Sequence, residues 1–241
     1  MKKMNLKKFG VIPLIILYMV FPLSFSLSKM GMLYAPSTTF IALRMVLSGL
    51  FFLVCFAIQH KGRFTLTFVD YRLFFKASFF GIYLTYVPEL WALQYLSVAK
   101  SAFLFVLAPF FTALFTHIYE KEIFSNKKII GLMIGLVGFI PILIATTSTE
   151  ETFKSFSFLN LPEIITILSV ACYAYSWIPI KQLMNDKKYS PWLINGVAML
   201  GGGIGATVTA FFCDGWYTGV SPVTNWTALS WYLFLILLVG V

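Results

Sequence analysis

Long apolar stretches, separated by short polar connections, run along almost the whole chain. Most of them hold about 20 residues, the length at which a helix rising 1.5 Å per residue crosses a hydrocarbon core about 30 Å thick. Their apolar positions are continuous rather than alternating, which indicates helices and argues against a membrane β-barrel. The pattern predicts eight spans, at Gly10–Ser28, Ser37–Gln59, Leu73–Tyr95, Val98–Tyr119, Lys128–Thr146, Leu161–Leu183, Pro191–Cys213 and Leu229–Val241.

The last of these runs, Leu229–Val241, is shorter than the others and has no polar flank after it. A run of about 13 residues does not cross a bilayer as a helix. We therefore expect the chain to stop inside a helix, after seven complete spans and part of an eighth.

The composition supports a membrane protein. Hydrophobic residues make up 59% of the 241 positions, charged residues make up 11%, and the mean hydropathy is +0.86. A soluble domain carries about 25% charged residues. We therefore predict an all-α, polytopic membrane helix bundle whose main partner is the lipid bilayer.

The basic residues predict the orientation of the bundle. Alternate connections hold most of the 18 lysines and arginines, whereas the other connections hold only Lys29, Lys100 and Lys154. Basic residues in short loops mark the cytoplasmic side, so the N-terminus is predicted to be cytoplasmic. The net charge of +9 then reflects topology, and no nucleic-acid partner is expected. The basic connections carry Lys2, Lys3, Lys7, Lys8, Lys61, Arg63, Arg72, Lys76, Lys121, Lys127, Lys128, Lys181, Lys187 and Lys188.

Signs of catalytic chemistry are weak. The two histidines, His60 and His117, both fall near the predicted cytoplasmic boundary, with no acidic partner at a useful spacing. The three cysteines form no C-x-x-C pair and lie in or at the end of apolar runs, as small core residues do. We expect no catalytic residues, no metal and no cofactor. The longest connection, residues 147–160, is too short for a soluble domain.

Two opposite charges lie inside predicted spans. Arg44 is placed roughly 11 Å below the outer face, and Glu89 roughly 9 Å below it. A lone charge at the bilayer centre costs about 2.5–3.5 kcal/mol on insertion scales, so each should face the bundle interior. Two interpretations remain open: a static ion pair that ties two spans together, or a polar cavity that binds a substrate.

Further candidates lie near these charges. Tyr86 is three residues before Glu89 and shares its helical face, while Tyr173 and Trp177 are four residues apart. Such aromatic residues are more often packing than binding residues, but beside a carboxylate they suit a cationic or ring-bearing ligand. Lys100 could line the same cavity or extend towards the membrane surface. The substrate-binding candidates are Arg44, Tyr86, Glu89, Lys100, Tyr173 and Trp177.

Prolines fall within several spans. Each frees a backbone carbonyl, which is tolerated only against protein or a cavity. Interrupted helices at corresponding places are a pointer to transport sites. The candidate helix breaks are Pro88, Pro109 and Pro179.

One long stretch carries a resemblance to a known family. It runs Trp91-Ala-Leu-Gln-Tyr-Leu-Ser-Val-Ala-Lys-Ser-Ala-Phe-Leu-Phe-Val-Leu-Ala-Pro109 and resembles the third and fourth spans of EamA-type transporters, of the drug/metabolite transporter superfamily. Arg44-Met-Val-Leu-Ser-Gly49 in the second span is similar to the same family. The resemblance implies ten helices in two inverted repeats of five, a central cavity, alternating access and a bacterial inner (plasma) membrane.

The implied organisation divides the chain into three parts. Residues 1–146 form a first repeat of spans 1–5, residues 147–160 an external loop, and residues 161–241 an incomplete second repeat of spans 6–8. A faint internal match supports this, because Ser37–Gly49 aligns with Ser190–Gly202. The family pattern has two more spans, so we expect a chain truncated after span 8, with a laterally open cavity, low stability and no transport of its own.

Three functions are compatible with the sequence. The first is a secondary carrier of a small organic metabolite, the second a non-transporting scaffold or degenerate truncated paralogue, and the third, the least favoured, a membrane enzyme. The segment Pro88-Glu-Leu-Trp-Ala-Leu-Gln-Tyr95 followed by Lys100 resembles a branch of the family in which some members exchange S-adenosylmethionine for S-adenosylhomocysteine. A sulfonium cation joined to an adenine ring would suit a carboxylate beside aromatic rings.

Overall fold

The computed structural model describes residues 23–59, 68–121, 130–131, 133–135, 138, 160–186, 189–219 and 221–240. Within these residues the elements are helices, and no strand occurs. Four helical runs are long and apolar enough to cross a membrane: Ser37–Gln59, Val98–Tyr119, Leu161–Asn185 and Pro191–Cys213. The predicted all-α membrane bundle is confirmed. The first and fifth predicted spans lie mostly outside the described residues.

Two long helices, α3 (Ser37–Gln59) and α10 (Pro191–Cys213), form the most extensive helix pair. They run antiparallel, because Asp214 at the end of α10 binds Thr38 and Thr39 at the start of α3. Glycine allows the close approach of the two backbones: a Cβ on Gly49 would lie 2.6 Å from the backbone nitrogen of Leu200.

The third predicted span is one helical run built from α4 (Phe68–Ser78), the π-helical turn η1 (Phe79–Tyr83) and α5 (Leu84–Leu93). It begins five residues before the predicted Leu73. Asp70 lies in the first turn of α4, where a carboxylate favours a helix N-terminus, so the helix extends beyond the apolar run.

The fourth span changes its winding in the middle. It consists of α6 (Val98–Leu104), the 3₁₀ turn η2 (Phe105–Leu107) and α7 (Ala108–Glu120). Pro109 has no N–H to give to the carbonyl of Phe105, and its ring crowds that turn, so the helix tightens just before it.

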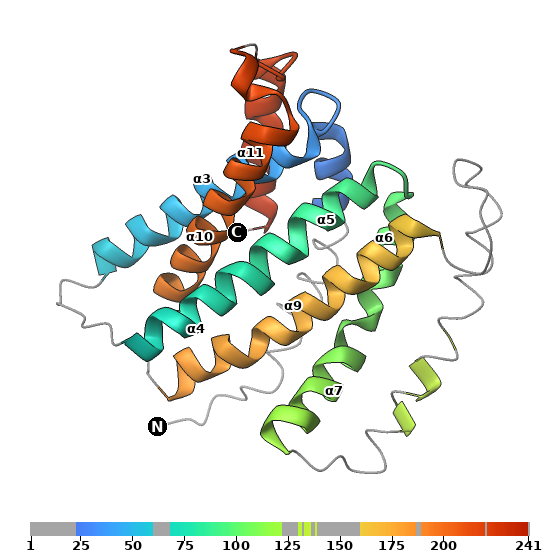
Figure 1. Ribbon diagram of the computed structural model, residues 1–241, viewed down its shortest axis with the longest axis vertical. Helices are drawn as coiled ribbons and strands as arrows, with labels where there is room; N and C mark the ends of the chain where they lie inside the picture. Colours follow the sequence, from blue (N-terminus) through green and yellow to red (C-terminus); the bar gives the residue numbers. More distant parts are fainter. Residues whose placement is uncertain are drawn as a thin grey trace, which may run out of the picture.

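The other described helices are α9 (Leu161–Asn185) and α11 (Trp226–Gly240). Figure 1 shows α9 lying beside the α4–α5 run, with α7 against α9. α11 begins at Trp226, three residues before the predicted Leu229, because Oδ1 of the preceding Asn225 accepts the Ala228 N–H at 3.1 Å. A further short helical segment, residues 23–31, precedes α3.

Candidate functional site: a cavity between α5, α9 and α10

A cavity of about 360 Å³ lies where the α4–α5 run, α9 and α10 meet. It falls within the range of about 300–1,000 Å³ that is typical of small-molecule sites. Three of the six predicted substrate-binding residues line it: Tyr86, Tyr173 and Trp177. The structure brings these three aromatic residues to one space, although they come from spans far apart in the chain; their binding of a substrate stays a prediction.

The π-helical turn shapes the wall of this cavity. A π turn widens the helix by one residue and shifts the side chains that follow it, and it is frequent at functional sites. In η1 the Leu84 N–H bonds the Phe79 carbonyl instead of the usual fourth-residue partner. Gly81 lies in this turn, and a Cβ there would come 2.9 Å from the Ser176 side chain. The missing side chain lets η1 lie directly against α9 at the cavity.

Tyr173 and Trp177 form an aromatic corner on α9. They are one helical turn apart, and their ring centroids lie 6.1 Å apart with an interplanar angle of 87°. This edge-to-face arrangement leaves perpendicular ring surfaces, against which a planar ligand can stack. α9 continues past Pro179 as one helix, and Pro179 itself is buried and does not line the cavity.

Arg44 and Glu89 lie close to Tyr86. Both are buried, with exposed fractions of 9% and 3%. The Arg44 guanidinium carbon is 5.6 Å from the centroid of the Tyr86 ring, a cation–π contact. Among the described residues, Arg44 and Glu89 form no ion pair within 4 Å. Neither residue lines the cavity, whereas Tyr86 does.

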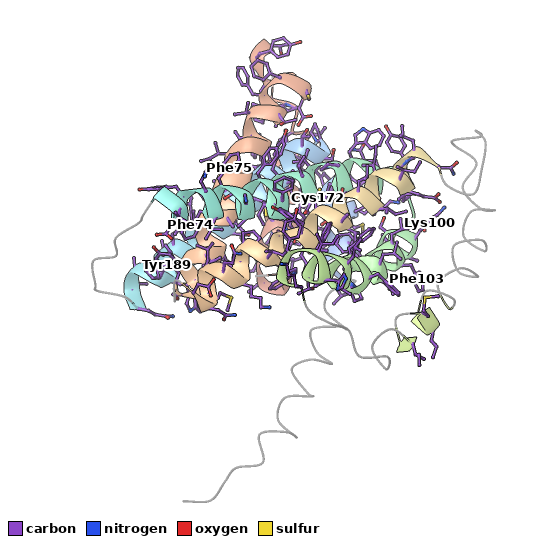
Figure 2. The ribbon with its side chains drawn as sticks, turned by 60° about the horizontal axis from the view of Figure 1, so that its bottom comes forward. Phe74, Phe75, Lys100, Phe103, Cys172 and Tyr189 are labelled. Atoms are coloured by element: carbon purple, nitrogen blue, oxygen red, sulfur yellow. The ribbon has the colours of Figure 1, made fainter. Side chains whose placement is uncertain are left out.

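Lys100 occupies a different place. It is buried in an ion pair with Glu163, which is also buried, and it does not line the cavity. The pair joins the start of α6 to the start of α9. Figure 2 shows Lys100 at the far end of the bundle from Phe74 and Tyr189, whose rings lie 5.6 Å apart.

The residue Glu163 was missed by the sequence analysis. One of its oxygens accepts the Asn160 backbone N–H at 2.7 Å, forming a capping box at the start of α9, and the other faces Lys100. The spacing Asn160-x-x-Glu163 before an apolar run was the available signal. No local sequence pattern predicts the ion pair, because Lys100 lies on another helix.

Asn195 on α10 was also missed. Its side chain is exposed and lines the cavity, and within the described part of the chain its amide forms no hydrogen bond. A primary amide offers two donors and one acceptor, and leaving it against lipid is costly. A single asparagine among small residues gave no pattern from which this position could be predicted.

Comparisons with known proteins agree with this architecture. A model of the EamA-like transporter family matches residues 8–144. A protein of Chlamydia muridarum (strain MoPn / Nigg), named an S-adenosylmethionine/S-adenosylhomocysteine transporter, is 30% identical over 205 residues, covering 84% of this chain and 63% of that protein. The transporter of the same name from Chlamydia trachomatis serovar L2 is 29% identical over 205 residues, which are 84% of this chain and 61% of the relative.

A shorter match comes from outside bacteria. A thiamine-repressible mitochondrial transport protein of Saccharomyces cerevisiae is 35% identical over 68 residues, covering 28% of this chain and 18% of the yeast protein. The chain thus spans less than two thirds of the length of the relatives that it matches. The family match covers more than half of the chain and agrees with the residues quoted above from spans 2 to 4. This multi-pass membrane protein belongs to the EamA-like transporter family.

Proposed function

We propose that the protein is a secondary transporter that carries a small organic metabolite by alternating access. The observation that carries this proposal is the cavity of about 360 Å³ between α5, α9 and α10. Its walls come from both predicted repeats, the α4–α5 run from residues 1–146 and α9 and α10 from residues 161–241. A site at the interface of two inverted repeats is where secondary transporters bind their substrates.

The antiparallel packing of α3 against α10 supports the inverted repeat. The internal match aligns Ser37–Gly49 of α3 with Ser190–Gly202 of α10. Asp214 joins the end of α10 to the start of α3. A repeat of five spans reverses the direction of its second copy, so paired helices are expected to run in opposite directions.

The substrate proposed is S-adenosylmethionine or a related metabolite that bears an aromatic ring. Two Chlamydia relatives carry the name of an S-adenosylmethionine/S-adenosylhomocysteine transporter. The aromatic corner of Tyr173 and Trp177 offers a stacking surface for an adenine ring. Arg44, Tyr86 and Glu89 complete the proposed substrate site, and Lys100 contributes to it through the packing of α6 on α9. The membrane proposed is the bacterial plasma membrane, with a cytoplasmic N-terminus.

Uptake into proteoliposomes tests this function. The full-length protein is reconstituted, and accumulation of radiolabelled S-adenosylmethionine is compared between vesicles preloaded with S-adenosylhomocysteine and empty vesicles. We expect faster accumulation in the preloaded vesicles. Trp177→Ala should weaken uptake because it removes a wall of the cavity, whereas Trp231→Ala, an exposed residue on α11, should not. A protein that accumulates no labelled metabolite under any gradient would instead favour a non-transporting scaffold.

A further inference from the structure

Arg44 and Glu89, next to Tyr86, carry hydrogen-bonding atoms without good partners among the described residues. Oε2 of Glu89 is buried and has no hydrogen-bond partner among the described residues. The hydrogen bond found for the Arg44 guanidinium within the described chain is a long one, 3.5 Å to Oγ of Ser28. A guanidinium carries five N–H donors and a carboxylate about four acceptor positions. Burying such groups without partners is costly, so this arrangement is suited to a ligand that supplies them.

The two charges are also opposite and do not close on each other. A static ion pair would bring them within 4 Å, and among the described residues these two form no such pair. Because their charges cancel, a simple cation or a simple anion gains little net attraction from the pair. A ligand that carries both charges on neighbouring atoms can satisfy both residues at once.

We propose that Arg44 and Glu89 recognise a zwitterionic α-amino acid group, Arg44 binding its carboxylate and Glu89 its ammonium group. The proposal rests on the transport function above and specifies the ligand of the same cavity. The planar fork of arginine matches a carboxylate with two parallel hydrogen bonds, and an ammonium group supplies three donors to a carboxylate.

Tyr86 controls access to these charges. Its side chain lines the cavity on one side and contacts the Arg44 guanidinium with its ring. Rotation of the tyrosine side chain away from Arg44 exposes the guanidinium to the cavity. The ligand carboxylate then replaces a cation–π contact with charge-assisted hydrogen bonds, which are stronger.

Other residues of the cavity lining suit a heteroaromatic ring. Tyr173 and Trp177 present ring surfaces at right angles, and the amide of Asn195 faces the same space with a donor and an acceptor. An amide of this kind pairs with adjacent donor and acceptor atoms on a ring edge, as asparagine does with adenine. The ligand class is therefore an α-amino acid that bears a heteroaromatic group.

This inference differs from recognition of a sulfonium cation. S-adenosylmethionine and S-adenosylhomocysteine share the zwitterionic end and the adenine ring, and they differ in the methyl group that gives the sulfur its charge. If the shared ends carry recognition, both compounds should bind with similar affinity. This would allow one cavity to bind both members of an exchange pair.

A competition series with the wild-type, full-length protein tests the proposal. Labelled S-adenosylhomocysteine is displaced by the unlabelled compound, by its decarboxylated form, by its N-acetyl form and by 5′-methylthioadenosine, which lacks both charges. We expect each single loss to weaken competition at least about tenfold, since a hydrogen bond to a charged group is worth this much. Competition by 5′-methylthioadenosine within about twofold of S-adenosylhomocysteine would overturn the proposal.

Two variants assign each charge to its residue. In Arg44→Gln, the decarboxylated compound should compete as well as S-adenosylhomocysteine, while discrimination against the N-acetyl form is retained. In Glu89→Gln, the N-acetyl form should compete as well as S-adenosylhomocysteine, while discrimination against the decarboxylated compound is retained. A merely structural role would weaken all ligands together and leave these ratios unchanged, and that result would overturn the assignment. If neither variant folds, the wild-type competition series still tests whether the zwitterionic end is recognised.

The failure of this inference can be told apart from the failure of the transport function. Uptake of adenosyl compounds without any preference for the zwitterionic end would overturn the inference alone. Wild-type protein that neither binds nor accumulates any compound of the series would overturn both.

Discussion

Asp214 illustrates how a single side chain depends on its surroundings. At the C-terminal end of α10 a carboxylate faces unpaired carbonyls and the negative end of the helix dipole, which is unfavourable. The Asp214 carboxylate, however, also lies at the N-terminal end of α3. There it accepts the Thr39 N–H at 2.8 Å and the Thr39 hydroxyl at 2.6 Å. Trp216, two residues after Asp214, donates to the same hydroxyl at 2.9 Å, so the end of α10 is held to the start of α3 by several hydrogen bonds.

We predict that Asp214→Asn lowers the stability of the protein by about 1 kcal/mol, the cost of losing an N-cap charge. Thermal unfolding in detergent measures the change. Asp186→Asn is the matched control, because Asp186 is an exposed residue at the C-terminal end of α9. Its replacement should leave the melting temperature unchanged or raise it slightly. Equal destabilisation by both variants would contradict the capping role.

The buried ion pair of Lys100 and Glu163 gives a larger prediction. Glu163→Gln leaves the lysine charge buried without its carboxylate, and breaking such a pair costs about 3–5 kcal/mol. The double variant Lys100→Met, Glu163→Gln should recover much of the loss, since no buried charge remains. Melting temperatures of the three proteins provide the measurement. A single variant as stable as the wild type would show that the pair does not hold α6 against α9.

Sequence reasoning at the residue scale succeeded where a residue's own helix determined its environment. Arg44 and Glu89 were expected to be buried because lipid penalises lone charges, and both are buried. Whether they bind substrate stays a prediction. Glu163 and Asn195 were missed because their importance depends on other helices, whose placement the one-dimensional pattern does not contain.

At the element scale, two helices were predicted with their observed bounds. α3 and α10 begin and end where the apolar run begins and ends, because polar residues flank both sides. The π turn of η1 was not predicted as such; Pro88, a predicted helix break, lies inside α5 just after this turn, and the helix continues through it. Gly81 within this turn lies against Ser176 of α9, a contact between helices that the sequence pattern does not contain.

The crossing of α3 and α10 provides a prediction about packing. In Gly49→Ala the added Cβ would meet the backbone of Leu200 at 2.6 Å, and a backbone atom cannot move aside as a side chain can. We expect a loss of about 1–3 kcal/mol, the usual cost of overpacking. Gly131→Ala is the control, because nothing lies within 4 Å of its Cβ position. There, alanine should be neutral or stabilising by up to about 1 kcal/mol. Equal melting temperatures for both variants would contradict the close crossing.

At the scale of the whole molecule, several polar contacts gather at the predicted outer ends of the helices, while the Tyr189 hydroxyl donates to Asp70 at the other end. The Lys100–Glu163 pair, the Asp214 cluster and the hydrogen bond from Lys29 to the Leu96 carbonyl lie at the predicted outer ends of their helices. The cavity extends towards the predicted inner ends, since Met184 near the end of α9 and Pro191 at the start of α10 line it. With the orientation proposed above, the cavity lies nearer to the cytoplasmic side.

The orientation itself can be tested by labelling single cysteines. Cys55, Cys172 and Cys213 are free and are first replaced by alanine. Two exposed positions then receive a cysteine. Asp186→Cys lies in the connection between α9 and α10, and Tyr217→Cys lies after the other end of α10.

The basic residues of the connection at 181–188 predict that Asp186 lies in the cytoplasm, and the single pass of α10 then places Tyr217 outside. A membrane-impermeant thiol reagent should label Tyr217→Cys in intact cells and label Asp186→Cys only after the membrane is permeabilised. Labelling of Asp186→Cys in intact cells would reverse the orientation. The cavity would then lie nearer to the outer side, although its residues and its proposed ligand would stay the same.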